Sequence, residues 1–325
     1  MSAPELGVVV APRCGGASSA AADHPSSSPA GFLVVDKPGG ITSHDVVATL
    51  RRALHLRRIG HTGTLDPMAT GVLVLCVGSA TRLARYVSSG RKQYRAEFTF
   101  GIETDTQDNT GVALRRCSAA ALRREDLERQ LPAFRGAILQ IPPMVSARRH
   151  NGVRLYELAR AGDEVDRAPV SVQISELLLE AFTPGENATA ELIVTCSSGV
   201  YIRTLAHDIG QAMGCGAVMS GLRRTWVGSA DGPFTLSTST LLPDLERPGA
   251  AESALLPLAT VASMMPIEMV DEEAEGRLMV GRAVPASDAG TDEEAVAALS
   301  GSGRLVAVCR RRAGHLLPET VMPAV

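Results

Sequence analysis

The chain has 325 residues, of which 45% are hydrophobic and 21% are charged, and its formal net charge is −3 at pH 7. This length allows one large domain with a substantial core plus a small one, and no apolar run reaches the roughly 18 residues that a bilayer-spanning helix needs. The six cysteines form no C-x-x-C pair and no zinc-type spacing, so the composition argues against a disulfide-stapled secreted domain and favours a reduced cytoplasm.

The first segments along the chain predict a tail, a strand and a helix. Residues 1–30 are rich in Ala, Ser, Gly and Pro without periodicity, which predicts a disordered extension. Residues 32–35 predict a short apolar strand. Thr42 or Ser43 can cap a helix that runs to about residue 55 and carries its apolar side chains on one face.

The segment with sequence GHTGTLDPMATG, residues 60–71, contains three glycines, one proline and a single carboxylate, Asp66. Glycine and proline at this density predict a loop with a fixed backbone path, and the apolar run at 72–77 predicts a buried strand behind it. Rigid loops of this kind hold reactive groups. An Asp before Pro is also a common turn former, because its side chain bonds its own backbone.

The next segments alternate between helix and strand patterns. Residues 80–89 predict a helix, and 93–100 alternate strictly, which predicts a half-buried strand with Tyr94 on its inward face. The polar composition of 104–117 predicts a loop. A helix rich in Arg and Glu is predicted at 120–130.

The second half of the chain begins with two predicted strands, 171–182 and 189–196, joined by a turn, and continues with a helix at 201–213. Strands and helices are mixed without a regular βαβ alternation. The predicted fold class is therefore α+β with a largely antiparallel sheet.

The charge is distributed unevenly. Residues 31–235 hold 24 Lys and Arg against 20 Asp and Glu, whereas residues 236–325 hold 7 against 13. Basic residues cluster within 51–58 and 148–160. Such clusters are compatible with RNA contact and equally with solvated helix faces, and composition alone does not decide between them.

Five segments resemble, in the family's order, the motifs of the TruB-type pseudouridine synthases. The similarity covers roughly residues 31–230. The loop around Asp66 matches the family's G-H-x-G-x-L-D-P. The other four are GFLVVDKP with TSHD at 31–45, KQY at 92–94, SGVYIRT at 198–204 and LRRT at 222–225.

The resemblance implies the pseudouridine synthase fold, an extended, largely antiparallel mixed sheet with the site in a central cleft. Together with the change of composition around residues 236–255, it divides the chain into segments. We expect a disordered extension at 1–30, a catalytic domain at 31–240, a linker at 241–255 and a small PUA-like β domain at 256–325.

The implied activity is isomerisation of uridine to pseudouridine in the T-loop of tRNA, at position 55. It would proceed by base flipping and by an aspartate-dependent cleavage and re-attachment of the uracil. The expected partner is the T-loop and stem of tRNA, and the expected protein is a cytoplasmic monomer that meets no membrane. No metal and no small-molecule cofactor is expected, since the sequence has no Walker loop, His/Cys cluster or dinucleotide fingerprint after a strand.

Three residues carry the implied chemistry. Asp66 is the nucleophile, Tyr94 stacks on the base or transfers a proton, and Arg203 forms an ion pair with Asp66. A carboxylate in a water-poor cleft tends to take up a proton, and a nearby guanidinium opposes this. From the residues alone, Tyr94 is also compatible with an ordinary core aromatic, and Arg203 with a surface arginine at the start of a helix.

Five further residues are expected to bind RNA or the target base. His61 supports the reorganised T-loop and Lys37 steadies the floor of the site. Tyr201 and Leu222 match positions that line the uracil pocket, although plain core positions fit them equally well. Arg149 keeps a positive charge where the family often has lysine, an exchange that alters a tight phosphate contact.

Two other functions remain open. One is a tRNA-folding chaperone that binds the T-loop, and the other is a guide-RNA-dependent pseudouridine synthase subunit. The intact set of Asp66, Tyr94 and Arg203 favours an enzyme over a pure chaperone. The short, weakly matching C-terminal region argues against the guide-dependent subunit.

Overall fold

The computed structural model describes residues 29–144, 146, 149–150, 152–154, 165–287 and 290–323. A disordered extension is expected at residues 1–30. Of these, residues 1–28 lie outside the described residues. Within the described ranges, no helix is long and apolar enough to cross a membrane.

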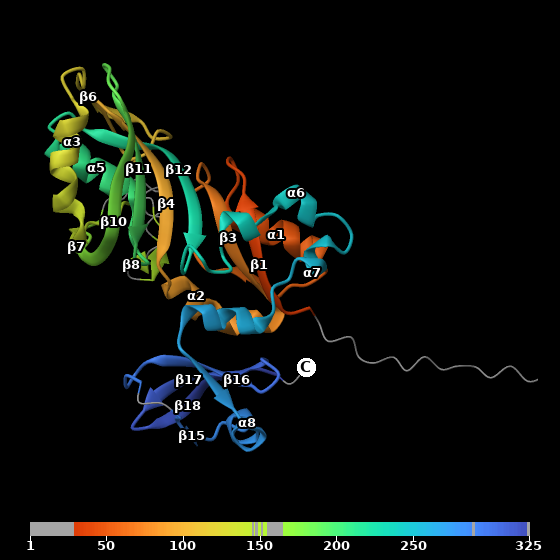
Figure 1. Cartoon of the computed structure of the whole chain (residues 1–325). Helices are drawn as coiled ribbons and strands as arrows, with labels where there is room; N and C mark the ends of the chain where they lie inside the picture. Colours follow the sequence, from red (N-terminus) through yellow and green to blue (C-terminus); the bar gives the residue numbers. More distant parts are fainter. Residues whose placement is uncertain are drawn as a thin grey trace, which may run out of the picture.

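A nine-stranded sheet forms the larger part of the molecule (Figure 1). Its strand order is β13-β1-β3-β12-β4-β11-β10-β7, with β2 paired to β3. The strands are β1 (Gly31–Lys37), β2 (Ile59–His61), β3 (Thr70–Val77), β4 (Lys92–Phe100), β7 (Gly136–Gln140), β10 (Val170–Thr183), β11 (Thr189–Cys196), β12 (Ala217–Val227) and β13 (Thr240–Leu241). Within this sheet, as far as the structure describes it, the β1–β13 and β12–β3 pairs are parallel and the other pairs are antiparallel. The predicted α+β class with a largely antiparallel mixed sheet is confirmed.

Helices pack against this sheet and bury its main core. They are α1 (Ser43–Ala53), α2 (Ala84–Ser89), α3 (Arg124–Gln130), α5 (Ile202–Ala212), α6 (Leu242–Leu245) and α7 (Ala250–Ser253), with 3₁₀ turns at Gly78–Leu83, Leu131–Phe134, Leu236–Thr238 and Leu258–Met264. Helix α1 begins as predicted, because the Thr42 side chain accepts from the backbone of Asp45 and the Asp45 carboxylate accepts from the backbone of Thr42. The apolar face of α1 joins the core on one side of β1 and β3.

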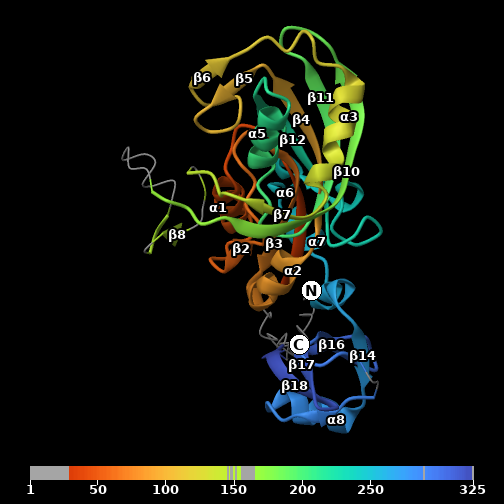
Figure 2. The ribbon, with the colours of Figure 1, turned by 90° about the vertical axis from the view of Figure 1, so that its left-hand side faces the viewer.

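The prediction of a loop at 104–117 is wrong in part. The segment is bounded by a hairpin of β5 (Ile102–Thr104) and β6 (Ala113–Arg116). All four residues of β6 are exposed, so the strand shows none of the apolar alternation that reveals strands in a sequence. Figure 2 shows this hairpin at the end of the large sheet that is farthest from the C-terminal strands. The helix predicted at 120–130 begins only at Arg124.

A separate five-stranded sheet follows near the C-terminus, in the order β14-β16-β17-β18-β15. It consists of β14 (Ile267–Val270), β15 (Val284–Pro285), β16 (Ala295–Ser300), β17 (Leu305–Arg312) and β18 (His315–Val321), with α8 (Glu272–Met279). In Figures 1 and 2 it lies beyond α2. The contact includes an ion pair of 3.1 Å between Arg85 and Glu319 and a hydrogen bond of 3.3 Å between the hydroxyls of Tyr86 and Thr320.

Residues 241–255, expected as a linker, contribute α6 and α7. Leu242, Leu245 and Ala251 belong to the core of the nine-stranded sheet. Just beyond, Leu256 pairs with Phe32 of β1. The segment thus packs on the large sheet along its length, and the division of the chain into domains stays a prediction.

Candidate active site

The loop that carries Asp66 is clamped by the first residue of α1. The Ser43 hydroxyl donates to the Leu65 carbonyl over 3.1 Å and accepts from the Leu65 amide over 2.9 Å. The Ala69 amide donates to the Asp66 carbonyl over 3.0 Å. Because the residue before Asp66 is held through both of its backbone groups, the carboxylate has a defined position.

Lys37 lies beneath this loop, at the end of β1. Its side chain is fully buried, and its amine donates to the carbonyls of Pro38, Ile41 and Pro67 over 2.8, 2.6 and 3.2 Å. Burial lowers the pKa of Lys37 to about 8, although Asp66 opposes the shift. These contacts support the predicted role in the floor of the site, because Lys37 ties three backbone segments together and does not line the cavity.

Gly71 allows β3 and β12 to approach closely behind the loop. Its φ of +96° lies in the region that favours glycine. A Cβ at this position would also overlap the backbone of Arg224. The last residue of the Gly-rich motif is therefore required both by its conformation and by packing.

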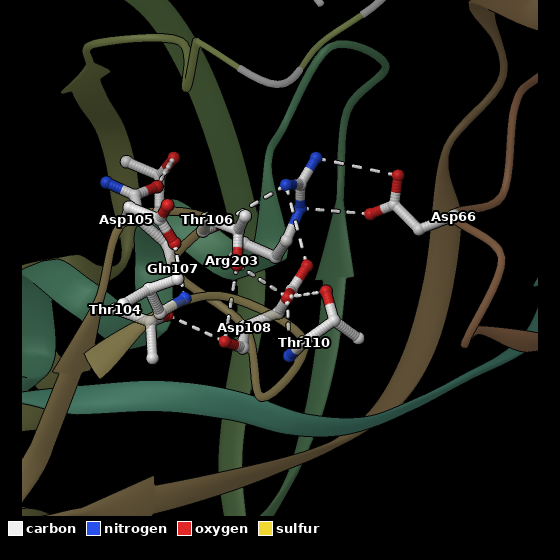
Figure 3. A network of polar contacts seen from close by, with 10 residues as sticks. Asp66, Thr104, Asp105, Thr106, Gln107, Asp108, Thr110 and Arg203 are labelled. Carbon is white, nitrogen blue, oxygen red and sulfur yellow. Dashed lines mark hydrogen bonds and ion pairs between the residues drawn. The ribbon is translucent and has the colours of Figure 1, made fainter. Parts of the chain in front are cut away.

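Arg203 lies at the start of α5 and faces Asp66 (Figure 3). Its Nε is 3.0 Å from Asp66 Oδ2, and its Nη2 donates to Oδ1 over 3.5 Å. The Arg203 side chain is only 5% exposed, whereas that of Asp66 is 34% exposed. The predicted ion pair is present, and the arginine is buried behind a carboxylate that remains open to the cleft.

The opposite side of Arg203 meets a second acidic group, which the sequence analysis missed. The Nη1 of Arg203 donates to the Thr106 carbonyl over 3.1 Å and lies 3.6 Å from Oδ2 of Asp108, the second acidic group (Figure 3). The Asp108 carboxylate accepts from the hydroxyls of Thr106 and Thr110 over 2.7 and 2.6 Å. The run DTQDNT at 105–110 is rich in Asp, Asn and Thr, whose side chains often form turns. This composition was the signal in the sequence that could have indicated a structured turn here.

Burial sets the protonation tendency of Asp66. Its pKa is raised, because burial disfavours the charged form and Asp108 adds to this, while Arg203 and Lys37 oppose it. The arginine therefore moderates the pKa of a carboxylate that the cleft would otherwise protonate more readily.

Asp66 and Arg203 border a cavity of about 270 Å³. This volume is just below the roughly 300 to 1,000 Å³ of sites for drug-sized ligands, which suits one nucleobase. Tyr94, Tyr201 and Leu222 line the same cavity, so the structure brings together residues that are far apart in the sequence. The remaining lining residues are Thr62, Gly63, Thr64, Leu65, Ser88, Lys92, Ser146, Ser198, Gly199, Val200, Ile202, Met219 and Arg224.

Gln140, a residue that the sequence analysis did not single out, holds the turn before α5. Its side chain accepts from the Tyr201 amide over 3.0 Å and donates to the Tyr201 carbonyl over 3.2 Å. This pair of bonds fixes the residue that precedes Ile202 and Arg203. The last residue of β7 therefore helps to position the start of α5.

Two predicted residues lie elsewhere or cannot be placed fully. His61 does not line the cavity; its ring packs edge-to-face on His44, with centroids 5.3 Å apart. Burial, and then the nearby charge of His44, lowers the pKa of His61 to about 4, so the ring is neutral near pH 7. For Arg149 the structure describes the backbone, in β8 (Arg149–His150), which pairs with β9 (Val153–Arg154), and its side chain lies outside the described residues.

No group of three or more His, Cys, Asp or Glu side chains that could hold a metal ion occurs in the part of the chain that the structure describes. The chemistry that these residues offer is an activated carboxylate beside an aromatic wall, in a small cavity with several cations.

Comparison with known proteins identifies the family. Residues 51–202 match the TruB family pseudouridylate synthase N-terminal domain, and residues 203–261 match the tRNA pseudouridylate synthase B C-terminal domain. A tRNA pseudouridine synthase B from Symbiobacterium thermophilum is 48% identical over 77% of this chain and 82% of its own length. The chain belongs to the TruB family of pseudouridylate synthases. A second TruB relative, from Gloeobacter violaceus, is 41% identical over 91% of this chain and 99% of its own length.

Solved structures share the fold of this chain. A chain from the crystal structure of a Cbf5-Nop10-Gar1 complex superposes with a TM-score of 0.70 at 26% identity, over 90% of this chain and 85% of that one. A chain from an archaeal box H/ACA Nop10-Cbf5 complex gives a TM-score of 0.67 at 24% identity, over 90% and 86%. The pseudouridine synthase fold expected from the sequence motifs is confirmed.

Proposed function

We propose that this chain converts uridine to pseudouridine in the T-loop of tRNA, at position 55. The observation that carries the proposal is the Asp66–Arg203 ion pair at the edge of a cavity of nucleobase size, in a chain of the TruB family. Relatives that share 41–48% of their residues with it over most of their length are named tRNA pseudouridine synthase B.

The reaction exchanges one bond of the ribose for another. The bond between C1′ and N1 of uracil breaks, a bond between C1′ and C5 forms, C5 loses a proton and N1 gains one. Asp66 acts as the nucleophile toward the sugar, which requires its ionised form. Arg203 keeps the carboxylate charged and aligned through its two-pronged contact.

The remaining cavity residues receive the base. Tyr94 offers an aromatic face for stacking and a phenol for proton transfer, and Tyr201 and Leu222 form further walls. The target uridine must leave its stack to enter, at an unstacking cost of a few kcal/mol. His61 supports the reorganised T-loop, and Arg149 contacts phosphate of the T-stem. Nothing is oxidised or reduced in this reaction, and side chains are assigned to its steps, so we propose that it uses no metal and no small-molecule cofactor. The protein acts as a cytoplasmic monomer.

We propose that the chain has two domains, a catalytic domain beginning at residue 31 and a PUA-like β domain at 256–325. The separate five-stranded sheet supports this division. The packing of residues 241–255 on the large sheet argues that these residues move with the catalytic domain.

The experiment uses purified protein and an unmodified tRNA transcript, with pseudouridine mapped along the RNA. Product at position 55 without any guide RNA supports the proposal. Product that appears only with a guide RNA would instead favour a guide-dependent subunit. Binding without product would favour a chaperone.

Asp66→Asn supplies the matched control, because it keeps the size of the side chain and removes its charge. It should abolish product while tRNA binding stays within several-fold of the wild type. Pseudouridine formed by Asp66→Asn near the wild-type rate would end the assignment of the nucleophile.

A further inference from the structure

Two cations are buried in the wall of the cavity. The first is Lys92, the first residue of β4, whose side chain lines the cavity although the residue is only 7% exposed. Its amine donates to the carbonyls of Ser88 and Gly90, over 2.8 and 2.7 Å, where α2 ends. An ammonium group at the carbonyl end of a helix is favourably placed. These two bonds hold the amine in place and leave its third proton available.

The second cation is Arg224 of β12, which is 2% exposed and lines the same cavity. Its Nε donates to the Val72 carbonyl over 2.6 Å, and its Nη2 donates to the Gly63 carbonyl over 3.0 Å. In the register of the sheet it lies directly opposite Tyr94. The guanidinium is thus fixed at two points beside the aromatic wall.

Lys92 and Arg224 approach one another at Gly63. A methyl group placed on Gly63 would lie 3.6 Å both from Lys92 Cε and from Arg224 Nη1. Within the described parts of the chain, neither cation forms an ion pair with a carboxylate, and both donate to backbone carbonyl oxygens. Buried charges are normally paired because their desolvation is costly. Two neighbouring cations without a carboxylate therefore indicate a place for a transient negative charge.

We propose that Lys92 and Arg224 form an electrostatic subsite that receives the uracil ring as an anion when its bond to the ribose breaks. The proposal rests on the function proposed above. When an Asp66 oxygen forms its bond to C1′, the electron pair of the C1′–N1 bond stays with the ring, and its charge spreads over N1 and the two carbonyl oxygens. Fixed donors aimed at a charge that develops during reaction stabilise it without reorganisation.

The depth of the two cations favours the base over a phosphate as the occupant. Asp66, which must meet the sugar, is 34% exposed, whereas Lys92 and Arg224 are almost fully buried. They also flank Tyr94, the residue on which the base would stack. A nucleotide that enters with its sugar at Asp66 brings its ring, and not its backbone, to these cations.

The charge of Lys92 gives the subsite a measurable pH dependence. Burial, and then the charge of Arg224, lowers the pKa of Lys92 to about 8. The other titratable groups that face it are Cys196 of β11, whose own pKa burial raises to about 12, and Asp66 across the cavity. Lys92 therefore loses its charge as the pH rises through about 8, and cleavage should slow over that range.

The test is a set of single-turnover rates at saturating protein, from about pH 6 to about pH 10, with the tRNA transcript as substrate. The wild type should slow above pH about 8. Lys92→Met should be slower by about 10² to 10³, as for loss of one oxyanion-hole donor, with tRNA binding within several-fold and no alkaline fall. Lys92→Arg keeps a charge that does not titrate, so it should retain most of the rate and also lose the fall.

Arg224 is tested in the same profile. Arg224→Met should slow the reaction and move the alkaline fall to higher pH, because removal of a neighbouring cation raises the pKa of Lys92. Its matched control is Arg223→Met, since Arg223 is 40% exposed and pairs with Asp36 over 2.6 Å, away from the cavity. Arg223→Met should leave both the rate and the profile unchanged.

Lys37 supplies the decisive comparison, because burial lowers its pKa to about 8 as well. Lys37 contacts backbone carbonyls and does not line the cavity, so its titration should not slow cleavage, and Lys37→Met should keep the alkaline fall. A fall that disappears in Lys37→Met, or persists in Lys92→Met or Lys92→Arg, would overturn the subsite. An inactive wild type would instead refute the proposed function, and a wild-type rate in Lys92→Met alongside an inactive Asp66→Asn would refute the subsite alone.

Discussion

Replacing Arg203 by Met tests how the charge of the nucleophile is maintained. The change removes a guanidinium that contacts both Asp66 and Asp108 and roughly keeps the volume. Burial already raises the pKa of Asp66, and Arg203 opposes that rise. Without Arg203 the pKa of Asp66 should rise further, because the neighbouring positive charge that opposes the rise is lost.

The expected result is a rate that depends on pH below about 8, where the rate of the wild type does not. Below its pKa the carboxylate loses activity about tenfold per pH unit. Because Arg203→Met also leaves the nucleophile unaligned, its turnover at neutral pH should fall by about 10². Its remaining activity should rise with pH, because alkali restores the ionised form. Arg203→Lys should recover only part of the rate, since an ammonium cannot make the two-pronged contact with Asp66.

Stability provides an independent measurement. Removing one partner of a buried pair costs about 3–5 kcal/mol, and a smaller loss is expected here because a third of the Asp66 side chain is exposed. The loss should be largest at high pH, where Asp66 is charged and lacks its cation. Urea unfolding across pH measures it. A normal rate with the wild-type pH–rate profile in Arg203→Met would show that another cation sets the charge of Asp66.

The other predictions concern the frame of the site. Ser43→Ala removes both hydrogen bonds to the Leu65 backbone and should lower the free energy of unfolding in urea by about 1–3 kcal/mol. It should also lower kcat more than it changes KM, and an unchanged kcat would contradict the role of Ser43 in holding the loop. Gly71→Ala should cost several kcal/mol or prevent folding, whereas Gly199→Ala, at φ +86° with open space around it, should cost about 1 kcal/mol; equal costs would refute the packing explanation. A fragment of residues 31–240 lacks α6 and α7 and should be less stable than one of residues 31–264, by circular dichroism melting; equal melting temperatures would show that these helices add nothing.

The sequence predicted what depends on local pattern. The loop at 60–71 was recognisable because glycine and proline fix its path, and the strict alternation at 93–100 correctly placed Tyr94 on the inward face. The partnership of Asp66 with Arg203 came from the motif resemblance. Local pattern could not supply it, because 137 positions separate the two residues.

Asp108 and Arg224 show where sequence reasoning ended. Asp108 stands in a polar run that predicts a loop, and only the folded chain reveals that this loop buries a carboxylate against Arg203. Arg223 and Arg224 are adjacent in the sequence but differ in environment. The Arg223 side chain is 40% exposed and forms an ion pair, whereas Arg224 is buried in the cavity wall. The alternation of side chains along a strand predicts that Arg223 and Arg224 lie on opposite faces of the sheet, but it does not predict which face borders a cavity.

The sequence does not show which charges the fold brings to the cavity, so a net charge of −3 says little about RNA recognition here. Lys92, Arg203 and Arg224 line the cavity beside the single carboxylate of Asp66, so the space that would receive the base is locally cationic. Buried charges of this kind act more strongly than charges in water. A few buried cations at the bottom of a cleft can thus stabilise a reacting anion whatever charge the exposed surface carries, and the acidic C-terminal segment does not weaken the proposal.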